Sequence, residues 1–351
     1  MSLKDVIGQE SAINVLRKAI SAGRVASAYL FQGLSGTGKM FTAINFAKAL
    51  NCESGKDADE GQFGINDSCD KCPSCRKIND ENHSDLLIVE PVKGEVKGLR
   101  PINGEKQKKG NREIKVDQIR MLEGALSLKA YEARYKVAII DEAHLMRVEA
   151  ANAFLKTLEE PPPGTVIILV SASPERLPDT VRSRCLTLNF KPLGEKEMDA
   201  LLGPKFPDPE TRQTLIKLST GRPGLALSGD LFEKRKDFLK SLSEMAAGSR
   251  TVAWTDKEDI EDFIDMCGLL LRDVLIYKLT RDEGLLINTD ISKSINSLTK
   301  GVLEEVIIDC YGKIAALRGN LVYNPNKSIL WNYMGTVLGK LKMGNEAFAN
   351  A

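Results

Sequence analysis

One glycine-rich loop constrains this chain more than any other stretch. A short apolar run from Ala28 leads into a G-x-x-x-x-G-K pattern over residues 33–39, and an amphipathic helical run follows over 41–50. Strand, glycine loop and helix in this order are the setting of a phosphate-binding loop, where backbone N–H groups and the helix N-terminus face an anion. The residues expected around the phosphates are Gly33, Gly36, Gly38 and Lys39.

The residue after the lysine departs from this pattern. Ser or Thr there supplies a hydroxyl to Mg²⁺, but this chain has Met40, whose thioether is a poor ligand for a hard cation. Thr42 is no obvious substitute, because two residues along a helix are about half a turn apart. We therefore predict a degenerate nucleotide site, in which ATP with Mg²⁺ is disfavoured.

A second apolar run, 136–140, ends in two acids, Asp141 and Glu142. Behind a glycine loop, the acid at such a strand end holds the Mg²⁺ shell, and a following Glu polarises the attacking water. The alternative is that Asp141 only caps the next helix. We include both acids in the predicted nucleotide site and expect His144 on the surface where that helix starts.

Four cysteines favour a metal site, and they are Cys52, Cys69, Cys72 and Cys75. Three of them are separated by two residues each, so four thiolates can close a tetrahedral zinc site. The alternative is a set of free thiols on a loop. We favour structural Zn²⁺, because the segment has too few apolar residues to fold unaided and four protein ligands leave no open position. His83 could compete as a ligand, but we expect an ordinary loop histidine.

Apolar runs alternate with helical patterns up to residue 190. The expected strands are the run from Ala28 and those at 85–89, 136–140, 165–170 and 186–190. A helix at 150–158 stops before Pro161, since a residue before proline avoids the helical region. This alternation predicts the α/β class, with a parallel sheet covered on both faces.

After residue 191 the pattern is helical only. Helices are expected at 264–279, 303–317 and 329–341, with Trp331 and Tyr333 in the core of a bundle. The predicted domains are therefore 1–190, with a knuckle inserted at 52–75, a small helical domain at 191–245 and a helical C-terminal domain at 246–351.

The bulk properties limit the partners and the compartment. The chain has 351 residues, so we expect two or three domains. Its net charge is only +1, so the overall charge does not favour binding to nucleic acid or to a membrane. In a reducing compartment its seven cysteines are expected to be metal ligands or buried thiols. A charged N-terminus and no apolar run of membrane length favour a reducing cytoplasm. The basic segment 92–115 is interpreted as a solvated excursion, in preference to a nucleic-acid contact.

Two further motifs give the chain a family likeness. Residues 151–162 have the sequence ANAFLKTLEEPP, and residues 183–185 are Ser-Arg-Cys. With the glycine loop, the knuckle and the acid pair, in this order over residues 6–190, they resemble the clamp-loader branch of the AAA+ ATPases, which serves bacterial DNA polymerase III. The resemblance implies an AAA+ domain, a helical lid and a C-terminal oligomerisation collar.

The resemblance also implies a function and partners. In this family, related subunits form an arc that uses ATP to open a sliding clamp and place it on primed DNA. A stator subunit lends an arginine finger to its neighbour, and the matching residue is Arg184. The alternative for Arg184 is a structural salt bridge. The implied partners are gamma/tau-like motor subunits, a delta-like subunit and, through the assembly, the clamp and primer–template DNA, with no membrane.

Departures from the family pattern favour the stator. Motor subunits carry Ser or Thr at Met40, Thr on the sensor strand near Ala172, and Arg near Gly224. We therefore predict a component of a DNA polymerase holoenzyme that is not itself an active ATPase. The alternatives are a catalytically active motor, because Lys39 and the acid pair are present, and a DNA-binding module built on the knuckle and the basic segment.

Overall fold

The computed structural model describes residues 1–55, 67–80, 82–92, 112–249, 252, 254, 257–321 and 325–341. Most of the predicted basic excursion therefore lies outside the described residues, and its nucleic-acid interpretation stays a prediction. The described residues form two compact units. The first holds the residues up to Val92, Arg112–Pro207 and Thr220–Leu225, and the second holds Asp208–Ser219 and the residues from Ala226 onward. The predicted division into three domains stays a prediction.

The first unit is built on one five-stranded sheet. The strands are β1 (Ala28–Gln32), β2 (Leu86–Val89), β3 (Lys136–Ile140), β4 (Thr165–Ser171) and β5 (Leu186–Asn189). They lie in the order β2-β3-β4-β1-β5, and every pair is parallel. The expected α/β class is therefore confirmed. Because parallel strands end at a common edge, the loop after β1 and the acid pair after β3 lie on the same side of the sheet.

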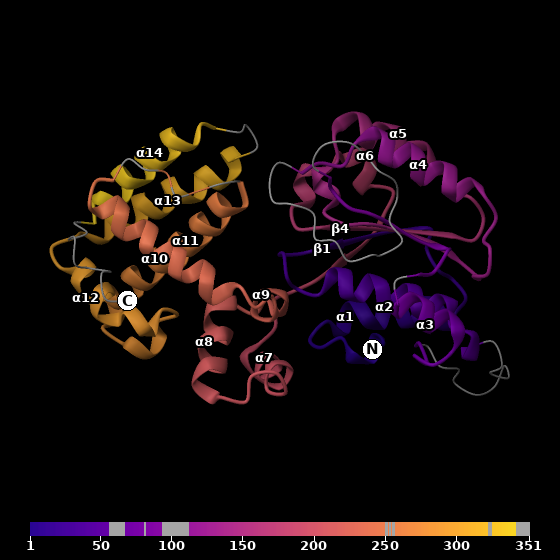
Figure 1. Cartoon of the computed structure of the whole chain (residues 1–351), viewed down its shortest axis with the longest axis horizontal. Helices are drawn as coiled ribbons and strands as arrows, with labels where there is room; N and C mark the ends of the chain where they lie inside the picture. The colour runs from indigo at the N-terminus through magenta and orange to yellow at the C-terminus, as the bar shows by residue number, and fades with distance from the viewer. Residues whose placement is uncertain are drawn as a thin grey trace. The chain divides into compact units, whose positions relative to one another are not determined.

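Helices cover both faces of this sheet. The helices of the first unit are α1 (Glu10–Ser21), α2 (Lys39–Asn51), α3 (Pro73–Asn79), α4 (Val116–Ser127), α5 (Val148–Glu159), α6 (Asp179–Arg182) and α7 (Glu195–Leu202). Figure 1 shows α4, α5 and α6 on one face and α1, α2 and α3 on the other. Alternate residues of β1 follow this division, since Leu30 packs with the first set and Tyr29 and Phe31 with the second.

The helix after the glycine loop differs from its expected amphipathic character. α2 is buried on nearly all sides, and even Asn45, Lys48 and Asn51 are almost inaccessible to solvent. These polar side chains tolerate burial because they are hydrogen-bonded. Asn51, for example, exchanges two hydrogen bonds of 2.9 Å with the backbone of Tyr135. α2 is thus a central element, and the loop at its N-terminus stands on a rigid support.

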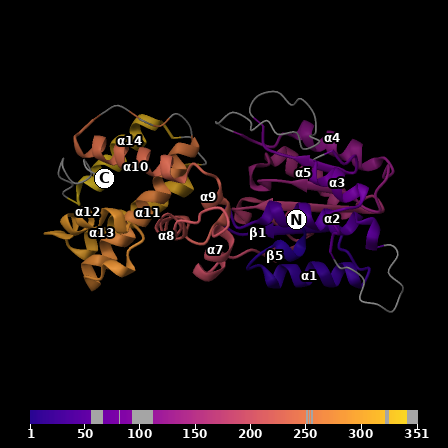
Figure 2. The ribbon, with the colours of Figure 1, turned by 60° about the horizontal axis from the view of Figure 1, so that its bottom comes forward.

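The second unit is a helical bundle. Its helices are α8 (Pro209–Ser219), α10 (Leu231–Ala246), α11 (Lys257–Thr280), α12 (Ser292–Thr299), α13 (Glu304–Asn320) and α14 (Lys327–Gly339), while α9 (Pro223–Leu227) joins the two units in sequence. Figure 2 shows these helices gathered around α11. Trp331 lies in the core as expected, but Tyr333 is 41% exposed, so its predicted core position is wrong. Two residues along a helix turn the side chain to the other side.

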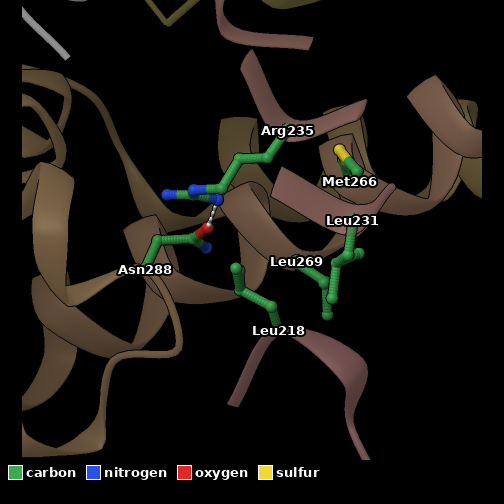
Figure 3. A pocket seen from close by; sticks show the side chains of 6 residues that line it. All are labelled: Leu218, Leu231, Arg235, Met266, Leu269 and Asn288. Atoms are coloured by element: carbon green, nitrogen blue, oxygen red, sulfur yellow. Dashed lines mark hydrogen bonds between the residues drawn. The ribbon is translucent and has the colours of Figure 1, made fainter. Parts of the chain in front are cut away.

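A polar network lies inside this bundle. The Arg235 guanidinium donates to Asn288 Oδ1 at 2.6 Å, and Asn288 in turn donates from its backbone and side chain to the fully buried Asp273, both at 2.7 Å. Figure 3 shows Arg235 and Asn288 beside a small pocket, which is otherwise lined by Leu218, Leu231, Met266 and Leu269. The network ties α10 to α11 and to the segment before α12.

Candidate functional site

The glycine loop has the backbone that its sequence requires. Gly33, Gly36 and Gly38 all have positive φ, at 146°, 80° and 88°, which favours glycine. A Cβ at Gly33 would also lie 2.2 Å from the carbonyl oxygen of Phe190. The loop therefore winds tightly between β1 and α2, as the phosphate-binding pattern predicts.

The lysine of the loop is turned back onto the loop itself. Lys39 Nζ donates to the carbonyl oxygens of Gly33 at 2.6 Å and Leu34 at 2.5 Å. Burial lowers the pKa of Lys39 to about 8, against the opposing influence of Asp141 and Glu142. The ammonium group thus satisfies the carbonyls of its own loop, where a phosphate-binding loop would direct it to the outer phosphates.

No hydroxyl on α2 takes the place of the missing metal ligand near the loop. Met40 is half-buried and packs against the core under the sheet. The hydroxyl of Thr42 is buried and donates to the Gly38 carbonyl at 2.9 Å, so it serves the helix. This agrees with the expectation that Thr42 does not replace a Ser or Thr at position 40.

The two acids lie at the end of β3. Asp141 accepts a hydrogen bond from the backbone N–H of Glu142 at 2.9 Å, and burial raises its pKa. Glu142 has a positive φ of 45° and pairs with Arg112 at 3.3 Å. His144 is half-buried, with Nδ1 3.4 Å from the Ser171 hydroxyl at the end of β4, and so it is less exposed than expected.

The glycine loop also contacts the start of α9, which the sequence did not suggest. At the start of α9, the backbone N–H of Gly224 donates to the Gly36 carbonyl at 2.8 Å. A Cβ at Gly224 would lie 2.8 Å from the Gly36 Cα, which is too close for any other residue without a shift of the backbone. The only sequence signal was the Gly-Arg-Pro-Gly run at 221–224, which carries no information on its partner.

The four cysteines come together as the zinc prediction requires. Their sulfur atoms all lie within 4.8 Å of one another, and the set is Cys52, Cys69, Cys72 and Cys75. Zn–S bonds of about 2.3 Å in a tetrahedron separate the sulfurs by about 3.8 Å, so this cluster fits a zinc ion after a small contraction. Thiolates in such knuckles are supported by backbone N–H groups, and here three of the sulfurs accept from N–H groups at 3.3–3.5 Å.

Side chains around the knuckle hold it in place. Asp70, between the first two cysteines of the knuckle, has a positive φ of 56° and pairs with the buried ammonium of Lys48 on α2. His83 lies outside the cysteine cluster and is buried, where we expected an ordinary loop residue. Its Nδ1 accepts from the Asp85 N–H at 3.1 Å, and its Nε2 is 3.2 Å from the Ser74 hydroxyl. These bonds occupy the nitrogen atoms that a metal would need.

Arg184 lies just after α6 and is partly exposed. Its Nη1 donates to the Thr180 carbonyl at 2.6 Å, and its Nη2 pairs with Glu159 at 2.5 Å, while 34% of its side chain is accessible. The next residue, Cys185, is anchored by packing against the core, and burial raises its pKa to about 12. The salt bridge considered as an alternative for Arg184 is thus present within the chain.

Comparisons with known proteins identify relatives of both units. Residues 8–194 match the family model described as DNA polymerase III, delta subunit, and residues 229–334 match a second model, which describes the C-terminal part of the same protein. The delta′ subunit of Bacillus subtilis is 31% identical over 301 residues, which cover 82% of this chain and 83% of that protein. The tau subunit of the same organism is 27% identical over 342 residues, which cover 87% of this chain and 56% of that protein.

The chain thus spans only about half the length of this tau relative. A gamma-subunit-related protein of Thermotoga maritima is similar in structure, with a TM-score of 0.43, 16% identity and coverage of 95% of this chain and 99% of that one. Among the described residues, no helix has the length and apolar character needed to cross a membrane.

Proposed function

The chain belongs to the DNA polymerase III clamp-loader family, and from this premise we propose that it acts as a delta-prime-like stator that donates Arg184 to a neighbouring subunit's ATP site. The relatives are gamma, tau and delta′ subunits, so the partners that we propose are gamma/tau-like motor subunits and a delta-like subunit. Through this assembly the chain would support ATP-driven loading of the sliding clamp on primer–template DNA.

The contacts that the glycine loop makes with its own lysine and with α9 are the observation that carries the non-hydrolysing role. Lys39 is bonded to Gly33 and Leu34, and the Gly36 carbonyl is bonded to the start of α9. Nucleotide binding would have to break these contacts. It would still lack a hydroxyl for Mg²⁺, because position 40 is a methionine, which is half-buried against the core. A subunit of this kind suits a rigid support better than a motor.

The chemistry of Arg184 suits action on a neighbour. A guanidinium placed beside a transferring phosphoryl group neutralises the charge that develops there, which is worth roughly 10³–10⁵ in rate in other NTPases. The side chain is accessible and stands on a backbone fixed by α6. In this proposal the knuckle would hold Zn²⁺ through its four thiolates, and the ion's role would be to stabilise the fold.

The test is the ATPase activity of the reconstituted assembly, stimulated by clamp and primed DNA. We expect Arg184→Ala to lower the rate of hydrolysis at the neighbouring site by roughly 10³-fold, to a residual rate. Arg182→Ala is the matched control, because Arg182 is an exposed arginine at the end of α6, two residues before Arg184, and pairs with Asp179 on the same helix. Activity of the Arg184→Ala assembly equal to that of the wild type would contradict the proposal.

The second candidate is an active gamma/tau-like motor. Lys39, Asp141 and Glu142 are all present at the edge of the sheet where a nucleotide would lie, and the tau relative matches most of this chain. A motor should bind ATP with Mg²⁺ and hydrolyse it, and Lys39→Ala should abolish both. Titration calorimetry of ATP into the purified chain, with and without Mg²⁺, separates the candidates, since the stator predicts no gain from Mg²⁺.

A further inference from the structure

The guanidinium of Arg184 is held between two acceptors from different helices. Nη1 donates to the carbonyl oxygen of Thr180 on α6, and Nη2 donates to Oε1 of Glu159 at the end of α5. An arginine on a surface normally samples many rotamers, and these two contacts favour one orientation. A guanidinium has five N–H donors, so donors remain for the oxygen atoms of a phosphate.

Glu159 stands at a position where a carboxylate is otherwise unfavourable. It is the last residue of α5, and the helix cannot continue into the three prolines from Pro161. The carbonyl groups at a helix C-terminus carry partial negative charge and repel an acid. The ion pair with Arg184 offsets this repulsion and stabilises the carboxylate at the end of α5.

The geometry of the pair is set by packing and not by the pair itself. Phe154 and Leu158 of α5 are buried in the same core as Val181 of α6 and the preceding Leu177. Cys185, next to Arg184, donates its S–H to the Val181 carbonyl at 3.4 Å. The backbone at both residues of the pair is therefore fixed. Removing the Glu159 carboxylate should change the rotational freedom of the Arg184 side chain without moving the Arg184 backbone.

We propose that Glu159 is a positioning residue that fixes the orientation of the Arg184 guanidinium for its action on the neighbouring ATP site. This inference rests on the proposed function of Arg184. The pair is partly exposed, at 34% for Arg184 and 49% for Glu159, so it adds little to the stability of the fold. Its effect is on catalysis, because an oriented guanidinium loses less freedom when the transition state forms.

The experiment compares Glu159→Ala, Glu159→Gln and the control Glu160→Gln in the reconstituted assembly. Glu160 is the exposed acid next along the chain. We expect Glu159→Ala to lower kcat of the stimulated ATPase by about two- to fivefold with an unchanged KM, in line with the modest worth of an exposed charge pair. Glu159→Gln keeps an acceptor oxygen and should therefore show a smaller drop in kcat. The kcat of Glu160→Gln should equal that of the wild type.

A double-mutant cycle separates positioning from a structural role. If Glu159 acts through Arg184, the variant Glu159→Ala with Arg184→Ala is no slower than Arg184→Ala alone. Additive losses, a change in KM only, or a faster Glu159→Ala assembly would overturn the inference. A large loss in Arg184→Ala beside normal activity in Glu159→Ala overturns this inference alone, whereas normal activity in Arg184→Ala overturns the proposed function as well.

Discussion

The backbone N–H of Gly224 donates to the carbonyl oxygen of Gly36 at 2.8 Å, and the two Cα positions are so close that neither residue can carry a side chain without displacement. A Cβ at Gly36 would meet the Leu225 nitrogen at 3.3 Å, and a Cβ at Gly224 would meet Gly36 at 2.8 Å. A side chain at either position would therefore displace the contact between the glycine loop and the start of α9.

Gly224→Ala should destabilise the first unit. The methyl group would push α9 away from the loop and weaken the hydrogen bond to Gly36, for a cost of about 1–3 kcal/mol. Thermal unfolding measures this loss. Gly124→Ala is the matched control, because Gly124 lies in α4 with open space at its Cβ, and alanine there should stabilise the helix by about 1 kcal/mol. A Gly224→Ala variant as stable as the wild type would mean that the contact is not maintained in solution.

The purified chain should contain one zinc ion. Because thiolates hold it, Cys72→Ser should lose the metal and unfold at a lower temperature, as metal binding and folding are coupled in small knuckles. Elemental analysis and thermal unfolding are the measurements. The control variant Cys185→Ala should still contain one zinc ion per chain, since Cys185 lies outside the cluster. Well under one zinc per freshly purified wild-type chain would refute the prediction.

Local patterns predicted the sheet well because each buried strand is a short apolar run. The expected strands at 136–140 and 165–170 correspond to β3 and β4 almost to the residue. The cysteine cluster was also predictable, since the spacing of the knuckle leaves its sulfur atoms few arrangements. These features depend on residues that are near one another in the sequence.

Contacts between distant segments were not predictable in the same way. Nothing in the sequence pairs Gly36 with Gly224, or Glu159 with Arg184. Such contacts depend on how helices pack against one another, and the spacing of apolar residues along the sequence does not report it. The burial of His83 was missed for a related reason. A histidine between two predicted elements is interpreted as a loop residue until its partners, Ser74 and the Asp85 N–H, are known.

The buried carboxylate of Asp85 should give the first unit a defined acid sensitivity. Burial alone would raise the pKa of Asp85, but N–H groups of residues 131–133 outweigh it and hold the pKa below its usual range. An acid with a depressed folded pKa stabilises the fold above the unfolded pKa of about 4, and this contribution is lost as the pH falls through the folded value.

Asp85→Asn tests this sign. At pH 7 the variant should be less stable by about 1–3 kcal/mol, because a neutral amide oxygen accepts hydrogen bonds more weakly than a carboxylate oxygen does. Its NH₂ group would also replace the second oxygen, which accepts from the Tyr131 N–H at 2.9 Å. The difference between wild type and variant should shrink as the pH falls below about 4. Asp80→Asn, at an exposed acid after α3, should show no such trend in the free energy of unfolding. A difference that stays constant with pH would contradict the assignment.

The polar network of the second unit should depend on Arg235. Its side chain is 8% exposed and donates to both carboxylate oxygens of Asp290 at 2.7 and 2.8 Å, as well as to Asn288. Arg235→Ala leaves the buried Asn288 oxygen without this donor, whereas the half-exposed Asp290 gains water in its place. We expect a loss of about 2–4 kcal/mol, at or below the cost of breaking a fully buried pair.

Arg235→Lys separates charge from geometry in this network. Lysine keeps the positive charge but cannot bond two carboxylate oxygens and an amide in one plane, so it should recover only part of the loss. Lys236→Ala, at the exposed neighbouring position, should stay within about 0.5 kcal/mol of the wild type in chemical denaturation. If Arg235→Ala unfolds at the same denaturant concentration as Lys236→Ala, then the bundle is held by its apolar core alone, and the network only fills the space beside the small pocket.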